Sequence, residues 1–294
     1  MIALLVLSLF WGYNWVVMKE ILRYVGPFQF GAIRTFFGSL LLFAILLALG
    51  KPLHLQHAWR VASIGLLQTG CFTALIVYAL MSGGAGKVAV LTYSMPFWVM
   101  ILAWPLLGEK LRGLQWLAAL ASVLGLLLIV EPWHMQGSLL SSVLAVIAGV
   151  CWALAVILAK QLHQQTLRMD LLAFTAWQML IGSLPLVLLG VLMPAPPIQW
   201  TGYFIGAALY NVIACNALAW LLWLYALQHL PAGVASMVSL LTPVVGVLAA
   251  WMQLHEAPTA AELIGMLSIA FAIMVLAWRG MRRHEEVEPA LAQE

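Results

Sequence analysis

The stretch of sequence that decides the fold is residues 138–160, SLLSSVLAVIAGVCWALAVILAK. It carries no charge before its last residue, Lys160. About 20 apolar residues are enough for a helix to cross the hydrocarbon core of a bilayer. The apolar residues are continuous rather than alternating, which favours a helix over a barrel strand. The stretch therefore predicts a membrane-spanning helix.

Nine similar runs fill most of the remaining chain, separated by Gly- and Pro-containing breakers such as Gly50-Lys51-Pro52. The ten predicted spans are residues 2–20, 28–49, 59–81, 85–107, 113–130, 138–160, 170–192, 202–227, 232–254 and 260–279. Hydrophobic residues make up 65% of the 294 and charged residues only 8%, against about 25% charged in soluble proteins. The chain is thus predicted to be an all-α integral membrane protein. This composition excludes intrinsic disorder, nucleic-acid binding and a disulfide-stapled secreted domain.

The few basic residues indicate an orientation. With the N-terminus in the cytoplasm, nine of them fall on the inner side: Lys51, Arg60, Lys110, Arg112, Lys160, Arg168, Arg279, Arg282 and Arg283. Lys19, Arg23 and Lys87 fall outside. Because cytoplasmic loops carry the excess of Lys and Arg, we expect both termini in the cytoplasm.

The two halves of the chain resemble each other. Trp11-x7-Lys19 recurs as Trp152-x7-Lys160 at a shift of 141, and Gly38-Ser39-Leu40 recurs at a shift of 144 as residues 182–184. At a shift of 147, the matches are Tyr78-Ala79-Leu80 with residues 225–227, Ala85-Gly86 with Ala232-Gly233, Pro96 with Pro243, Trp104 with Trp251 and Glu109 with Glu256. The collinear order indicates an internal duplication.

Each repeat contains five predicted helices, so the second half enters the membrane from the opposite side. We expect an N-terminal repeat over residues 1–131, an inverted C-terminal repeat over 138–279 and a flexible cytoplasmic tail over 280–294. Inverted repeats are typical of secondary transporters, with the substrate site near the midplane between the halves. The sequence therefore predicts two inverted five-helix repeats around a central cavity.

Several motifs resemble a known family. They are Phe10-Trp11-Gly12-Tyr13-Asn14 in the first helix, the mid-helix prolines Pro96 and Pro243, and Leu107-Gly108-Glu109, which Leu254-His255-Glu256 repeats. With these motifs the chain resembles the ten-helix, EamA-type branch of the drug/metabolite transporter superfamily. The resemblance covers about residues 2–279. It implies a multi-pass carrier of the bacterial inner membrane that commonly exports amino acids or other small metabolites. The abundant aromatic residues make the chain similar to the exporters of aromatic and neutral amino acids.

Acidic residues and histidines avoid the predicted spans and fall at helix ends or in loops. An intramembrane enzyme would need acid and base groups or a metal cluster at depth, so we expect neither an enzyme nor a cofactor or metal site. Proton relays usually use buried Asp, Glu or His residues, and the absence of such residues well inside the spans disfavours carboxylate-coupled proton antiport. The small multidrug relatives carry a glutamate in the first helix, where this chain has Asn14.

Arg34 is the one basic residue predicted to lie well inside a span, since the others lie within two residues of a span end or outside the spans. Two interpretations remain open. It could be the counter-ion for a substrate carboxylate, or it could reach the outer interface or the carbonyls at a helix end, since it lies only about two turns into its helix.

We expect the cavity to be lined by aromatic rings and uncharged polar groups. The predicted substrate-binding residues are Trp11, Asn14, Tyr78, Tyr93, Ser94, Trp98, Trp152, Asn211 and Ser239. Pro96 and Pro243 are predicted to kink their helices and to free the carbonyls of Thr92 and Ser239 for a substrate ammonium. Indole and phenol rings favour solutes with an apolar or aromatic body and a polar end.

These observations predict a secondary carrier that exports amino acids with apolar or aromatic side chains by alternating access. The partners would be a small-molecule substrate and the lipid bilayer, and a complete inverted pair in one chain predicts a functional monomer. The alternatives are multidrug or cation efflux, and transport of another metabolite such as a sugar or nucleoside.

Overall fold

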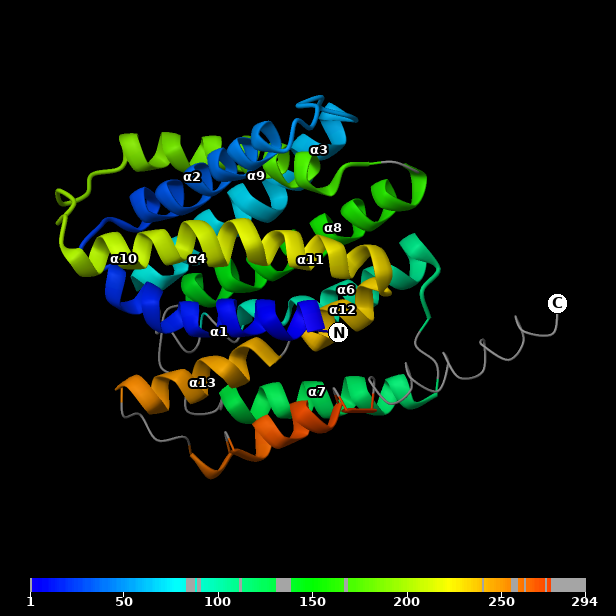
Figure 1. Cartoon of the computed structure of the whole chain (residues 1–294). Helices are drawn as coiled ribbons and strands as arrows, with labels where there is room; N and C mark the ends of the chain where they lie inside the picture. Colours follow the sequence, from blue (N-terminus) through cyan, green and yellow to red (C-terminus); the bar gives the residue numbers. More distant parts are fainter. Residues whose placement is uncertain are drawn as a thin grey trace.

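The computed structural model describes residues 2–82, 88, 91–110, 113–130, 139–166, 169–239, 241–254, 259–261, 263–272 and 274–275. Every regular element in this part of the chain is helical (Figure 1). The predicted tail, residues 280–294, lies outside the described residues.

The first half contains five spans. They are α1 (Ile2–Ile21); α2 (Pro27–Ala48); the continuous run of α3 (Ala58–Gly65), η1 (Leu66–Cys71) and α4 (Phe72–Ser82); α6 (Met95–Leu107); and α7 (Leu114–Val130).

The second half repeats this order. Its elements are α8 (Leu139–Gln165); α9 (Leu171–Leu192); the continuous run of α10 (Gly202–Tyr210), η3 (Asn211–Leu218) and α11 (Ala219–His229); α12 (Ala232–Val238) with α13 (Leu241–Leu254); and helical segments at 260–261, 263–272 and 274–275.

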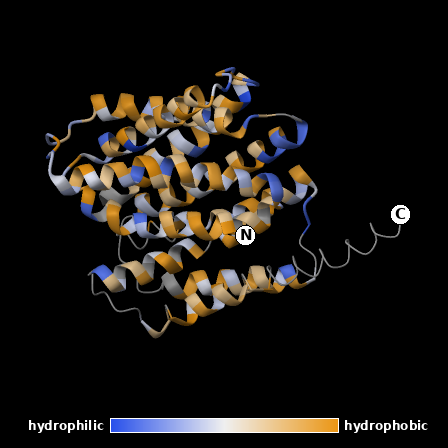
Figure 2. Cartoon of the chain, in the orientation of Figure 1, coloured by the Kyte–Doolittle hydropathy of each residue, from blue (hydrophilic) through white to orange (hydrophobic). Residues whose placement is uncertain are grey.

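Five of the described helices are long and apolar enough to cross a membrane, and five shorter apolar helices fall on the remaining predicted spans. Hydrophilic positions gather near the helix ends and loops, while the sides of the bundle are largely hydrophobic (Figure 2). Leu188, Val191 and Leu267 are among the large apolar side chains exposed on these sides. A hydrocarbon solvent explains this exposure, because lipid tails are as apolar as the side chains they meet.

The prolines do not kink continuous helices as predicted, because the fourth and ninth spans are broken instead. Ser94 precedes α6 as its N-cap and Pro96 lies in the first turn of that helix. In the ninth span α12 ends at Val238, and Pro243 is the third residue of α13. Pro lacks an N–H group and clashes with the preceding turn inside a helix, but the first turn tolerates it. The prolines thus marked the places where the helix is interrupted, but they did not show that one helix ends there and another begins.

The third and eighth spans share a feature that the sequence did not reveal. Both change from α-helix to π-helix near their centres, at η1 and η3, and then return to α-helix. π-Helical segments are uncommon and are frequently found at functional sites. Their occurrence at equivalent places in the two halves agrees with the duplication.

The two halves interlock. α2 and α9 pack side by side, α1 packs against α11 and α13, and α8 packs against α4 and α6 (Figure 1). The first helix of each half thus lies against the third and fourth spans of the other half. This crossing places the centres of α1 and α8 at the middle of the bundle.

One family motif has a visible structural role. Gly108 adopts a left-handed conformation (φ 68°) that ends α6, and the Glu109 carboxylate accepts a hydrogen bond from the Ala232 N–H at 2.9 Å. From the other half, the buried Lys160 ammonium donates to the carbonyls of Leu227 and Leu230 at 2.6 and 2.7 Å. Together Glu109 and Lys160 satisfy backbone groups at the turn between α11 and α12. The repeated motif, Leu254-His255-Glu256, extends beyond the described residues.

Candidate functional site

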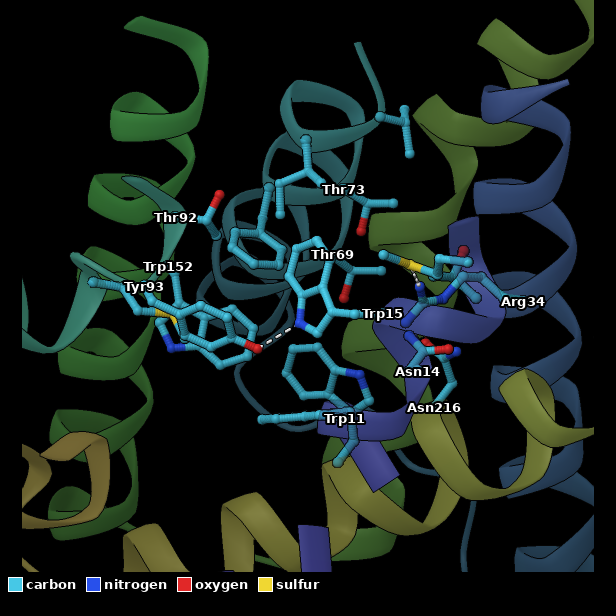
Figure 3. Close-up of a pocket in the computed structure, with 17 residues that line it drawn as sticks. Trp11, Asn14, Trp15, Arg34, Thr69, Thr73, Thr92, Tyr93, Trp152 and Asn216 are labelled. Atoms are coloured by element: carbon cyan, nitrogen blue, oxygen red, sulfur yellow. Dashed lines mark hydrogen bonds between the residues drawn. The ribbon is translucent and has the colours of Figure 1, made fainter. Parts of the chain in front are cut away.

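A cavity lies between the two halves near the centre of the bundle (Figure 3). Its lining comes from the first four spans of the N-terminal half and from α8, η3 and α11 of the C-terminal half. The lining residues are Trp11, Asn14, Trp15, Met18, Arg34, Thr35, Thr69, Phe72, Thr73, Ile76, Val77, Thr92, Tyr93, Met95, Trp152, Asn216 and Trp220.

Aromatic rings from both halves form one side of this cavity. The ring centroids of Trp11, Trp152 and Trp220 are 5.4–6.0 Å apart, and Phe72 lies 4.7 Å from Trp152. Trp11 meets Trp152 edge to face, the arrangement that ring quadrupoles prefer. This side offers a rigid apolar surface because the rings hold one another in place.

Hydrogen bonds fix two of the indoles. The Trp15 Nε1–H donates to the Tyr93 hydroxyl at 2.6 Å, and the Trp11 Nε1–H donates to the Cys215 carbonyl at 2.9 Å. The Cys215 carbonyl lies within η3, and Tyr93 lies at the break before α6. Two irregular segments, η3 in the eighth span and the break before α6 in the fourth span, therefore supply hydrogen-bond acceptors for the indoles of α1.

Polar side chains gather on the other side, where Figure 3 shows Arg34, Asn14 and Asn216 close together. Asn216 donates through Nδ2 to the Asn211 carbonyl at 2.8 Å within η3. The Asn14 Oδ1 and Thr69 Oγ1 are buried and have no hydrogen-bond partner in the described part of the chain. Buried polar atoms are nearly always paired, so unpaired ones facing a cavity indicate a place for polar ligand atoms.

Arg34 brings a positive charge to this polar side. It lies in the second turn of α2. Its Nη1 lies 3.1 Å from the Met18 sulfur, and its guanidinium carbon lies 5.7 Å from the centroid of the Phe30 ring. The buried Nε has no partner among the described residues. Of the two interpretations left open by the sequence, the contacts agree with a side chain on the cavity wall rather than one bound to helix-end carbonyls.

The structure brings some of the predicted site residues together. Trp11, Asn14, Tyr93 and Trp152 line the cavity. Among the others, Ser94 accepts from the Trp98 Nε1–H at 3.1 Å, just beyond the break.

The remaining predicted residues lie away from this cavity. Tyr78 is 42% exposed and stacks on Phe28. Asn211 is fully buried and donates to the Ala207 carbonyl. Ser239 is buried outside the described cavity lining, and its carbonyl, which Pro243 was predicted to free, accepts from the Thr242 N–H at 3.0 Å. The helix break accounts for this difference, because a turn consumes the carbonyl that a kink would have exposed.

Sequence reasoning missed several lining residues. Trp15 and Met18 could have been found, because residues 11, 14, 15 and 18 follow the spacing that places side chains on one helix face. Thr69 and Asn216 belong to the π-helical segments, whose irregular geometry left no signal in an apolar sequence.

A bundle of two interlocked five-span halves with a cavity between them defines a membrane transport protein of the inverted-repeat type. The model of the EamA-like transporter family matches residues 1–131 and again residues 139–278, and the chain belongs to this family.

Bacterial proteins named as transporters are similar to the chain over nearly its whole length. The uncharacterized transporter YoaV of Bacillus subtilis is 27% identical over 96% of this chain and 98% of its own. A probable amino-acid metabolite efflux pump of Salmonella typhimurium is 24% identical over 93% of both chains. One solved crystal structure has the same fold, with a TM-score of 0.83 at 18% identity over 96% of this chain and 97% of that chain. The family and the names of these relatives indicate transport rather than catalysis.

Proposed function

We propose that this protein is a secondary carrier that exports amino acids with apolar or aromatic side chains by alternating access. The observation that carries the proposal is the division of the cavity into an aromatic side and a polar side (Figure 3). Indole rings provide contact area for an apolar side chain, and the amides of Asn14 and Asn216 suit the polar end of an amino acid. The name of the Salmonella relative supports the same substrate class.

The packing of the halves suggests how the cavity would change its access. α1 and α8 each contribute a ring at the centre, and each packs against spans of the opposite half. Rocking α1 with its partners against α8 with its partners would separate Trp11 from Trp152. The breaks before α6 and between α12 and α13 provide points at which short helices turn without disrupting long hydrogen-bonded segments.

We base the setting of the proposed carrier on the basic residues for its orientation, on the family resemblance for its membrane, and on the complete pair of repeats in one chain for its oligomeric state. We place both termini in the cytoplasm of a bacterium, with the chain in the inner membrane and acting as a monomer. The described lining contains no carboxylate, which favours movement down the substrate gradient over antiport coupled to a titrating acid in the cavity. A cation exporter would be expected to place a carboxylate there.

Reconstituted protein tests the proposal. Proteoliposomes loaded with radiolabelled phenylalanine, tryptophan or leucine should release them with saturable kinetics. Release should be faster than from protein-free liposomes loaded with the same amino acids. Glucose, uridine and tetraphenylphosphonium serve as comparison solutes for the alternative substrate classes. The variant Trp152→Ala should slow efflux, whereas Trp104→Ala should not, because Trp104 is 59% exposed on the bundle surface. Failure to observe saturable efflux of any amino acid would overturn the proposal.

A further inference from the structure

We propose that Arg34 is the anion-binding residue of the cavity and that it selects solutes with a carboxylate group. This inference rests on the proposed function, because it assigns the polar end of the same substrate. It names the carboxylate as the substrate group that the cavity recognises, and it excludes amines that lack a carboxylate.

The first support is the unusual environment of the charge. Arg34 contacts a sulfur and an aromatic ring, both weak partners for a guanidinium, and it forms no ion pair in the described part of the chain. Arg34 is partly buried, with its Nε shielded from solvent, and a cation taken out of water without an anion is costly. Natural proteins pair such charges or use them functionally. Met18 and Phe30 keep the guanidinium in place without satisfying it.

The second support is the absence of a competing anion nearby. The described lining contains uncharged residues apart from Arg34, and α2 contains no Asp or Glu. The one acidic residue of α1, Glu20, is paired with Arg23 at 3.2 Å and is not part of the lining. A solute carboxylate would therefore be the first anion that this side chain meets. Arg is suited to that role because its planar donors match the two oxygens of a carboxylate.

The third support is the geometry around Arg34. Asn14, with its unpaired and buried Oδ1, lies beside Arg34 in Figure 3. A carboxylate on Arg34 would bring the α-ammonium of an amino acid near this acceptor. The rest of the solute would then extend toward Trp15 and Tyr93 on the aromatic side. One orientation thus satisfies the charged, polar and apolar parts of the cavity.

Ligand-dependent thermal stabilisation of the purified full-length protein in detergent tests the inference. The probes are L-phenylalanine, 3-phenylpropionate, which lacks the ammonium, and phenethylamine, which lacks the carboxylate. The proteins are wild type, Arg34→Gln, Arg34→Lys and the matched control Arg23→Gln. Arg23 carries the same charge but is exposed and paired with Glu20 at 3.2 Å, away from the cavity lining.

Phenylalanine and phenylpropionate should stabilise the wild type and Arg23→Gln, and phenethylamine should not. Arg34→Gln should raise the concentration needed for half-maximal stabilisation by about 30-fold, since a charge-assisted pair is lost. Arg34→Lys should retain part of the binding, because a single ammonium lacks the two-pronged donor geometry. The wild-type response to the three probes tests the inference even if the Arg34 variants fold poorly.

The outcomes separate the two proposals. If phenethylamine binds as well as phenylalanine, or if Arg34→Gln binds phenylalanine as the wild type does, the role of Arg34 is overturned and the proposed function stands. If phenylpropionate binds and phenylalanine does not, the role of Arg34 is supported and amino-acid export is overturned. If neither carboxylate binds the wild type, both proposals fall.

Discussion

α2 and α9 occupy equivalent places in the two halves, each has 22 residues, and they pack against each other. At a shift of 144 along the chain, however, Arg34 of α2 corresponds to Gln178 of α9. Arg34 lines the cavity, whereas Gln178 is fully buried and donates through Nε2 to the Gln68 Oε1 at 3.4 Å.

The difference teaches that the duplication preserved the framework and not the chemistry of the site. Trp11 and Trp152 are repeat mates and both line the cavity, so the apolar side retains some of the symmetry. The polar side draws its charge from one half alone. A substrate with distinct ends can occupy such a site in a single orientation, which a fully symmetric site would not enforce.

The largest expected effect comes from giving α9 the residue of α2. Gln178→Arg places a charge at a position that is 0% exposed and outside the cavity lining. An unpaired buried charge should lower the free energy of unfolding by about 4 kcal/mol. Thermal unfolding in detergent would measure this loss, with Gln164→Arg as the control because Gln164 is exposed. If the two variants were equally stable, the position of Arg34 on the cavity wall would not be the reason that the protein can keep an unpaired charge in α2.

The contact between the halves predicts the next effect. A Cβ atom added at Gly182 of α9 would collide with the Gly65 carbonyl and lie 2.5 Å from the Thr69 Cβ. At the repeat mate Gly38, the Cβ would meet side-chain atoms of Asn216 and Met179 at 2.9 and 3.1 Å. The overlap at Gly182 is deeper and involves a backbone carbonyl, whereas at Gly38 the Met179 Cε can move and the overlap with the Asn216 Cβ is slight. Gly182→Val should therefore cost about 3 kcal/mol and Gly38→Val about 1 kcal/mol.

The yield of monodisperse protein in size-exclusion chromatography and the melting temperature would report these changes. Gly206→Val is the control, since its Cβ would meet no atom within 4 Å. If Gly38→Val proved more damaging than Gly182→Val, the close approach of α9 to the third span would not be the tighter of the two contacts.

These glycines also show how far the sequence could predict the fold. The hydrophobic runs located the ten spans, and the Gly38-Ser39-Leu40 match at residues 182–184 helped to reveal the duplication. The match did not show that Gly182 is the closer contact, because that depends on the crossing of distant helices. Likewise, Pro96 marked a bend, but whether its helix would kink or end depends on how the flanking turn is satisfied.

The site was predicted in part for a similar reason. Trp11 and Asn14 were found because they combine polar or aromatic character with a central position in the first span, and both line the cavity. Tyr78 has the same character but faces outward. In a membrane protein both the lipid-facing and the inward-facing sides of a helix are apolar, so hydrophobic periodicity gives little indication of which side a residue faces.

A smaller effect is expected at the turn between α11 and α12, where Glu109 of the first half and Lys160 of the second half bond to backbone groups. Lys160→Met should keep the packing of the side-chain stem but remove the two donors to the carbonyls of Leu227 and Leu230. The expected loss is about 2 kcal/mol, measured by thermal unfolding. Lys110→Met is a suitable control because Lys110 is exposed. Losses of equal size would contradict a role for the buried ammonium.

The smallest effect returns to the first residues of α2 and α9. Asp170 caps α9 by accepting from the Leu172 and Ala173 N–H groups at 2.9 and 3.1 Å and pairs with Lys51 at 2.7 Å, whereas its repeat mate, Gly26, gives α2 no side-chain cap. Asp170→Asn preserves a good capping residue and removes a partly exposed ion pair, so it should cost less than about 1 kcal/mol at pH 7.

The pH dependence sharpens this expectation. Burial raises the pKa of Asp170, but the hydrogen bond from Lys51, the backbone N–H groups and the Lys51 charge together bring it below its ordinary value. A carboxylate with a lower pKa in the folded state stabilises the protein above its unfolded-state pKa of about 3.9. That contribution is lost as the pH falls through the folded-state pKa. Melting temperatures should therefore fall less steeply on acidification below about pH 4 in Asp170→Asn than in wild type, and parallel curves would contradict the assignment.

The surroundings of Gly26 explain why α2 has no side-chain cap equivalent to the one that Asp170 gives α9. A Cβ atom at Gly26 would lie 2.6 Å from the Ala195 Cβ, so Gly26→Asp must displace the loop that follows α9 before it can cap α2. Pro27 occupies the first position of α2, so this end of the helix already has one unpaired N–H group fewer. We therefore expect Gly26→Asp to leave the melting temperature unchanged or lower it, and a clear increase would show that the two helix starts are interchangeable after all.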